Sequence, residues 1–206
     1  MSTTRPTSQP DKALALLRRN GLTRLSEFRR AGITSATVSR LEAAGTITRL
    51  ARGLYQLADA DVNEHHTLAE ASKLVPNGVI CLTSALAYHD LTDQIPAQIW
   101  LAIGPKDWQP RLTYPPMRFA HFPTAYLKKG IERHQIDGVS VPIFSLPKTI
   151  ADLFRYRRSV DLDVAIEGLR ETIRQRKATP AELARYATDG GVWKVMEPYM
   201  SALTRG

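Results

Sequence analysis

The sequence predicts an α+β protein, and three observations lead to this fold class. Three short amphipathic runs near the N-terminus each end at a glycine, as helices commonly do: Gly21, Gly32 and Gly45. A run rich in β-branched residues, 46–57, follows directly and is typical of a hairpin. Beyond residue 60, strand-like and helix-like runs are mixed. With 206 residues, the chain is long enough to bury a core and to form one or two domains.

The composition is that of an ordinary globular protein. Hydrophobic residues make up 43% of the chain and charged residues 23%, a balance that argues against extensive disorder. Cys81 is the sole cysteine, which excludes an internal disulfide and a multi-thiolate zinc site, and its neighbours in "VICL" predict a buried, inert thiol. We see no signal-like segment and no run long enough to span a bilayer, so a cytoplasmic location is expected.

The positive charge is concentrated near the N-terminus. Residues 1–60 contain ten Lys/Arg and four Asp/Glu, a net charge of +6 out of +8 for the whole chain. A basic segment of this kind indicates a polyanionic partner, although charge alone does not separate DNA from RNA or an anionic membrane.

The order of elements in the first sixty residues predicts a helix-turn-helix followed by a wing. We expect three helices, over 11–21, 22–32 and 33–45. Thr34 is the expected N-cap of the third helix, and the hairpin is expected to turn at Arg52-Gly53. We therefore assign 1–10 to a flexible tail, 11–60 to a winged helix-turn-helix DNA-binding domain, and 61–206 to a C-terminal mixed α+β domain.

The C-terminal part predicts both strands and helices. Strands are expected over 97–104 and 117–122, and two more flank the turn signal Asp137-Gly138. Pro142 favours an edge position for its strand, because proline cannot donate to a neighbouring strand. Amphipathic helices are expected from residue 147 onwards.

The third predicted helix has the properties of a recognition helix. If Val38, Leu41 and Gly45 face inward, the opposite side carries the small residues Ala36, Ser39 and Ala43 together with Arg40. Such a face fits a major groove about 12 Å wide, with an arginine able to reach a guanine edge or a phosphate. Hydroxyls along the helix would reach phosphate oxygens or base edges, and Arg24 at the start of the second helix would contact a phosphate. The wing with its arginines would lie along the DNA backbone or enter the minor groove. The predicted DNA-binding residues are Arg24, Ser35, Ala36, Thr37, Ser39, Arg40, Arg49 and Arg52.

Two plainer interpretations stay open for this segment. Arginines on short amphipathic helices are often only a solvated face, and a three-helix arrangement with a hairpin can serve as a protein-interaction module. DNA binding is favoured because the charge, the small outward residues and the basic hairpin tip coincide within the same sixty residues.

Features of an enzyme are scarce, so no catalytic residue, metal site or cofactor is predicted. The five histidines form no H-x-x-x-H or H-E-x-x-H pattern. Asp161 and Asp163 resemble the paired carboxylates of metal-dependent nucleotidyl transfer, but they also fit the start of a helix. Two alternatives to a simple DNA-binding protein stay open: a nucleic-acid-directed enzyme, and a ligand-responsive transcriptional regulator with a winged-helix targeting domain.

Four segments resemble one known family over about residues 12–200. "LSEFRRAGITSATVSRLEAAGTITRLARGLYQL", followed by "GVICLTSALAYHDL", "QIWLAIG" and "SLPKTIADLFRYR", is similar to the AbiEi antitoxins of type IV toxin-antitoxin systems. The resemblance implies a transcriptional autorepressor that binds double-stranded DNA at inverted repeats in its own promoter. It also implies a second domain needed for antitoxin action, and a nucleotidyltransferase-like toxin that is countered without a stable complex. The oligomeric state is left open.

Overall fold

The computed structural model describes residues 8–61, 63–110 and 114–204. The described residues form two compact units, the first within the bounds Met1–Pro76 and His134–Val141 and the second within the bounds Asn77–Arg133 and Pro142–Gly206. The elements of the N-terminal part are α1 (Gln9–Asn20), β1 (Thr23–Arg24), α2 (Leu25–Arg30), α3 (Ser35–Ala43), β2 (Ile47–Ala51), β3 (Leu54–Leu57) and α4 (His66–Leu74). They are followed by β4 (Val79–Ile80), α5 (Leu82–Tyr88), β5 (Ile99–Ile103), β6 (Met117–His121), α6 (Thr124–Leu127), β7 (Ile131–Ile136), β8 (Val139–Phe144), α7 (Leu146–Arg155), α8 (Arg157–Val160), α9 (Leu162–Arg174), α10 (Pro180–Asp189) and α11 (Trp193–Thr204). The mixture confirms the predicted α+β class.

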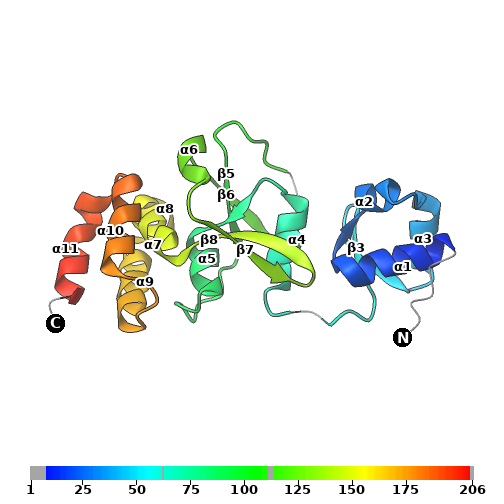
Figure 1. Cartoon of the computed structure of the whole chain (residues 1–206), viewed down its shortest axis with the longest axis horizontal. Coiled ribbons are helices and arrows are strands. Elements are labelled where there is room, and N and C mark those ends of the chain that lie inside the picture. The colour runs from blue at the N-terminus through cyan, green and yellow to red at the C-terminus, as the bar shows by residue number, and fades with distance from the viewer. Residues whose placement is uncertain (1–7, 62, 111–113, 205–206) are drawn as a thin grey trace. The chain divides into compact units, whose positions relative to one another are not determined.

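The N-terminal part of the first unit is a winged helix-turn-helix, as predicted. Helices α1, α2 and α3 pack around a small sheet of order β1-β3-β2, in which β2 and β3 form the wing (Figure 1). Its core is built from buried apolar side chains including Leu17, Phe28 and Val38, and the Phe28 ring meets that of Tyr55 edge-on at 6.0 Å. Strand β1 was not predicted, because only pairing with β3 gives so short a segment an extended backbone.

The helix boundaries of this part follow local sequence signals. Gly21, Gly32 and Gly45 all have positive φ, which explains why the helices end where the sequence predicted. The Thr34 side chain accepts a hydrogen bond from the backbone N–H of Thr37 at 3.3 Å, which confirms the expected N-cap of α3.

Helix α1 starts earlier than expected. Ser8 caps it in a capping box with Asp11, and the helix begins at Gln9, inside the segment assigned to the flexible tail. Residues 1–7 of that tail lie outside the described residues. The predicted domain boundaries stay a prediction.

The second unit contains most of a five-stranded mixed sheet of order β6-β5-β4-β8-β7. Strand β5 is parallel to β6 and antiparallel to β4, which is parallel to β8. All five residues of β5 are buried, in agreement with the expected strand. Helices α5 and α7 pack together in this unit, and α9, α10 and α11 gather near α7 (Figure 1).

The expectation that Pro142 marks an edge strand is wrong. Strand β8 lies between β4 and β7 in the order of the sheet. Proline is tolerated there because β4 has only two residues and its registered pairing with β8 is limited to Ile80 and Ile143, so little of β8 needs to donate to it.

A charged pair lies in the core of the second unit. Lys148 and Asp152, one turn apart on α7, are both fully buried, with Lys148 Nζ 3.0 Å from Asp152 Oδ2. The same ammonium lies 3.5 Å from the ring centroid of Tyr126 and 4.1 Å from that of Phe144. Burial lowers the pKa of Lys148 and raises the pKa of Asp152 to about 6, while the attraction between the two groups opposes both shifts.

Candidate nucleic-acid interface

The outward face of α3 is formed by small residues and one arginine. Ala36, Ser39, Arg40 and Ala43 are exposed, whereas the opposite side, which includes Val38, is buried. The predicted inward orientation is therefore confirmed for Val38 and Leu41, whereas Gly45, which was also expected to face inward, is exposed. Because most side chains on this face are small, the helix backbone can approach another surface closely.

The arginines near this face have no acidic partner within the described part of the chain. No ion pair recorded there involves Arg40, Arg49 or Arg52. Arg40 lies back along its own helix, where its Nε donates to the carbonyl oxygen of Ala36 at 3.4 Å. Because no carboxylate neutralises these charges, they remain available to an external anion.

The wing presents its arginines from a tight turn. Ala51 pairs with Leu54, which leaves Arg52 and Gly53 as the turn; Gly53 has φ of 74°. The Gly53 carbonyl accepts a hydrogen bond from the backbone N–H of Leu25 at 2.8 Å, which fixes the tip of the wing to the start of α2. The side chains of Arg49 and Arg52 are exposed.

Two of the predicted contact residues are placed differently from what the sequence suggested. Thr37 is 1% exposed, and its hydroxyl donates to Gln9 Oε1 at 2.8 Å, because the first turn of α3 faces the start of α1. Its hydroxyl is therefore not on the outward face. Arg24 is half-buried at the N-cap of α2, and its backbone N–H donates to Glu27 Oε2 at 2.7 Å.

Arg29 is a residue that the sequence analysis missed. It is exposed at the end of α2, and its Nε and Nη2 donate to the Ser35 hydroxyl at 3.2 Å and 3.1 Å. Helix α2 thereby brings an additional cation to the N-terminus of α3, where backbone N–H groups already favour anions. The sequence signal for the role of Arg29 is the short turn between the second and third predicted helices, because it places the end of one helix beside the start of the next.

Gln9 was also missed, because it was assigned to the tail. Its Oε1 accepts from the backbone N–H and hydroxyl of Thr34, both at 3.2 Å, and from the Thr37 hydroxyl. Its Nε2 donates to the Gly32 carbonyl oxygen at 3.2 Å. A single side chain thus ties α1 to the turn that positions α3. The Ser8-x-x-Asp11 capping pattern is the sequence signal for this earlier helix start.

We predict that Gln9→Ala loosens the start of α3. Losing these hydrogen bonds should cost the local structure about 1–2 kcal/mol. Amide hydrogen exchange, read over Thr34 to Val38, should become about tenfold faster in the variant, while the buried strand β5 in the other unit serves as the internal reference. Gln9→Glu keeps the acceptor oxygen, so its exchange should be accelerated less. Equal exchange rates in the parent and both variants would show that Gln9 does not support the turn.

The paired aspartates occupy the start of a helix. Asp161, with φ of 65°, directly precedes α9, and Asp163 lies in its first turn. Across the described residues, no group of three or more His, Cys, Asp or Glu side chains is arranged to hold a metal ion. Cys81 is a buried free thiol whose pKa is raised by burial, as expected from its apolar neighbours. None of the described helices is long and apolar enough to cross a bilayer.

Comparison with known proteins supports the description of both units. The fold is similar to the crystal structure of the RV2827C protein from Mycobacterium tuberculosis, with a TM-score of 0.56, 12% identity, and coverage of 96% of this chain and 82% of that one. At this identity the similarity supports the fold alone. Among curated proteins, none matches the chain. Residues 11–58 match the family described as transcriptional regulator, AbiEi antitoxin, so the resemblance seen in the sequence is confirmed for the winged-helix part of the chain.

Proposed function

We propose that this protein is a sequence-specific DNA-binding antitoxin and the transcriptional autorepressor of a type IV toxin-antitoxin operon. One observation carries the DNA-binding part of the proposal. The small-residue face of α3 and the wing together expose Arg40, Arg49 and Arg52 without an acidic partner among the described residues, in a segment with a net charge of +6. The family match over 11–58 supports the regulatory role.

In this proposal α3 enters the major groove with its exposed alanines and Ser39 against the base edges. Arg40, at the middle of the face, reaches a guanine edge or a phosphate. Arg49 and Arg52 of the wing contact the sugar-phosphate backbone, and Arg29 contacts a phosphate beside the N-terminus of α3. Thr37 makes no contact with DNA in this proposal because it is buried, and half-buried Arg24 contacts DNA at the edge of the interface. Inverted repeats would place two protomers on one operator.

Electrophoretic mobility shift is the direct test of the repressor function. The duplex upstream of the protein's own coding region should bind at least about 10³-fold more tightly than an unrelated duplex of the same length. Both affinities should fall as salt is raised, since phosphate contacts release counterions. Equal affinity for the two duplexes at every salt concentration would remove the repressor part of the proposal.

The antitoxin part rests on the family resemblance and needs a separate test. Expression of the nucleotidyltransferase-like protein encoded next to this chain should arrest the growth of the host cells, and co-expression of this chain should restore their growth. The triple variant Arg40→Ala, Arg49→Ala, Arg52→Ala should lose operator binding yet still restore growth, because antitoxin action is assigned to the second domain. Gel filtration of the two proteins together should show no stable complex; failure to restore growth contradicts antitoxin action.

A further inference from the structure

The second unit contains a cavity that the DNA-binding proposal does not use. It has a volume of about 590 Å³ and lies between α5, the segment 91–98 and the start of α9. Small-molecule sites are commonly about 300–1,000 Å³ in volume and largely apolar. Its apolar lining includes Leu86, Leu91, Trp100 and Val164. The size and the lining fit a small organic ligand.

An exposed apolar side chain lies on the rim of this cavity. Ile95, in the segment 91–98, is 93% exposed, while Trp100 in the wall is 7% exposed. A single exposed isoleucine is ordinary on a protein surface. At the mouth of an apolar cavity, however, it supplies further area that a bound ligand would remove from water.

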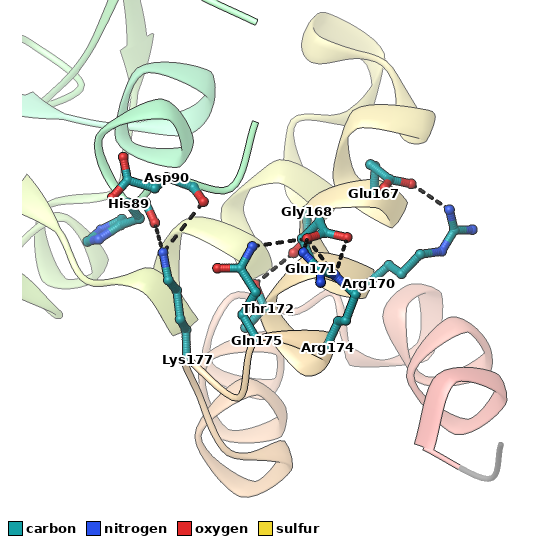
Figure 2. Close-up of polar contacts among 10 residues, drawn as sticks. All are labelled: His89, Asp90, Glu167, Gly168, Arg170, Glu171, Thr172, Arg174, Gln175 and Lys177. Carbon is teal, nitrogen blue, oxygen red and sulfur yellow. Dashed lines mark hydrogen bonds and ion pairs between the residues drawn. The ribbon is translucent and has the colours of Figure 1, made fainter. Parts of the chain in front are cut away.

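The rim of the cavity is acidic along α9. Asp163 and Glu167 lie one turn apart and are both exposed. The Glu167 carboxylate accepts a hydrogen bond from Arg170 at 2.6 Å (Figure 2). Asp163 has no hydrogen bond or ion pair recorded within the described segments, so its negative charge is not neutralised by the protein.

A second hollow continues this acidic edge. It has a volume of about 450 Å³, shares Glu167 with the first, and is also lined by Asp90, Asp93 and Glu171. Arg174 hydrogen-bonds to the Glu171 carboxylate and lowers its pKa to about 2, so Glu171 is ionised at neutral pH (Figure 2). Glu167 and Glu171 are each paired with an arginine, so Asp163 is the carboxylate lining the first cavity that has no recorded partner among the described residues.

The aromatic wall of the cavity already accepts a cation. The guanidinium carbon of Arg118, which is exposed on β6, lies 4.4 Å from the centroid of the Trp100 ring. Tryptophan is the side chain that attracts cations most strongly over its face. Arg118 thus occupies a position that a cationic ligand would have to take over.

We propose that this cavity binds an amphipathic organic cation, a site that goes beyond the DNA-binding and antitoxin functions and does not depend on them. The apolar body of the ligand packs against Leu86, Trp100 and Ile95, and its positive charge faces Asp163. A neutral apolar ligand would gain nothing from Asp163. An anionic ligand would be repelled by Asp163 and would depend on Arg118 instead.

Fluorescence titration of the full chain with berberine, a flat fused-ring cation that brightens on leaving water, tests the site without DNA. Berberine should bind saturably. Asp163→Asn should weaken binding about five- to tenfold, since one charge contact is lost. Ile95→Lys should weaken it at least as much, through lost apolar contact and added repulsion. Arg118→Ala should tighten binding about threefold, because it removes the competing cation from the Trp100 face.

The matched control is Glu197→Gln. It removes one carboxylate from α11, outside the cavity, and keeps an oxygen that can accept from the Ser201 hydroxyl. This variant should bind berberine like the parent. Circular dichroism confirms that each variant is folded before it is compared. The proposal would be overturned if berberine did not bind the parent saturably, or if the Asp163→Asn and Glu197→Gln variants bound it equally. Weaker binding by Arg118→Ala would also overturn it. So would tighter binding of the anion anilinonaphthalene sulfonate at the same site.

Discussion

Replacing Lys148 with alanine is expected to lower the free energy of unfolding of the second unit by about 3–5 kcal/mol, because it leaves Asp152 as an uncompensated charge in the core. The Arg155 guanidinium also favours the charged form of Asp152, but it lies 5.3 Å from the Tyr126 ring centroid, farther than the 3.5 Å of Lys148 Nζ. All three tryptophans, Trp100, Trp108 and Trp193, belong to this unit. Urea unfolding followed by tryptophan fluorescence therefore measures the loss directly.

The double variant Lys148→Met, Asp152→Leu is the matched control for this prediction. It replaces both charges by apolar groups of similar size, and such replacements of buried pairs are often neutral or stabilising. It should unfold at a urea concentration close to that of the parent. If the double variant were as unstable as Lys148→Ala, lost packing rather than the isolated charge would explain the loss.

The cost of Lys148→Ala should also depend on pH. Burial already raises the pKa of Asp152 to about 6 in the presence of Lys148, and without the ammonium this pKa should rise further. An acid with a raised pKa in the folded state favours folding at low pH and loses this contribution as the pH rises through the folded pKa. The variant should therefore be less destabilised at pH 5 than at pH 8. A loss independent of pH would mean that Asp152 is not the group left without a partner.

Local signals predicted most of the fold. The glycine stops, the Thr34 cap and the Arg52-Gly53 turn depend on the conformational preferences of neighbouring residues, which the sequence states directly. Strand β8 lies inside the sheet, which makes the Pro142 expectation wrong, and proline is tolerated there because β4 is short. The neighbours of a strand depend on pairing between segments far apart in the chain, such as Ile80 with Ile143, which no local pattern states.

The candidate interface was predictable to a similar extent. The periodicity of α3 was sufficient to place Arg40 outward and Val38 inward. The burial of Thr37 was not predictable from that periodicity, because it depends on Gln9, 28 residues earlier in the chain. The charge pair in α7 was equally hidden, since residues of this type are usually exposed and only the tertiary fold surrounds them with aromatic rings.

Arg40→Ala is expected to weaken operator binding by about 1–3 kcal/mol and to relax sequence preference at one base pair, if Arg40 contacts a base edge as proposed. Arg40 is exposed, and its only recorded hydrogen bonds are long contacts within α3, so the substitution should leave the fold intact. Mobility shift with the parent operator and with duplexes altered at single positions measures both effects. Arg19→Ala, which removes the same charge from α1 outside the proposed face, should change affinity much less.

Arg52→Ala should give a different pattern, because a wing arginine at the turn is placed to contact phosphate rather than base edges. Loss of one phosphate contact weakens binding to all sequences alike and reduces the slope of log affinity against log salt by about 1. The two variants therefore separate base recognition from backbone attraction within one pair of titrations. Identical behaviour of both would assign Arg40 to the phosphates as well. Binding of both variants like the parent would show that DNA does not contact α3 and the wing through these two arginines.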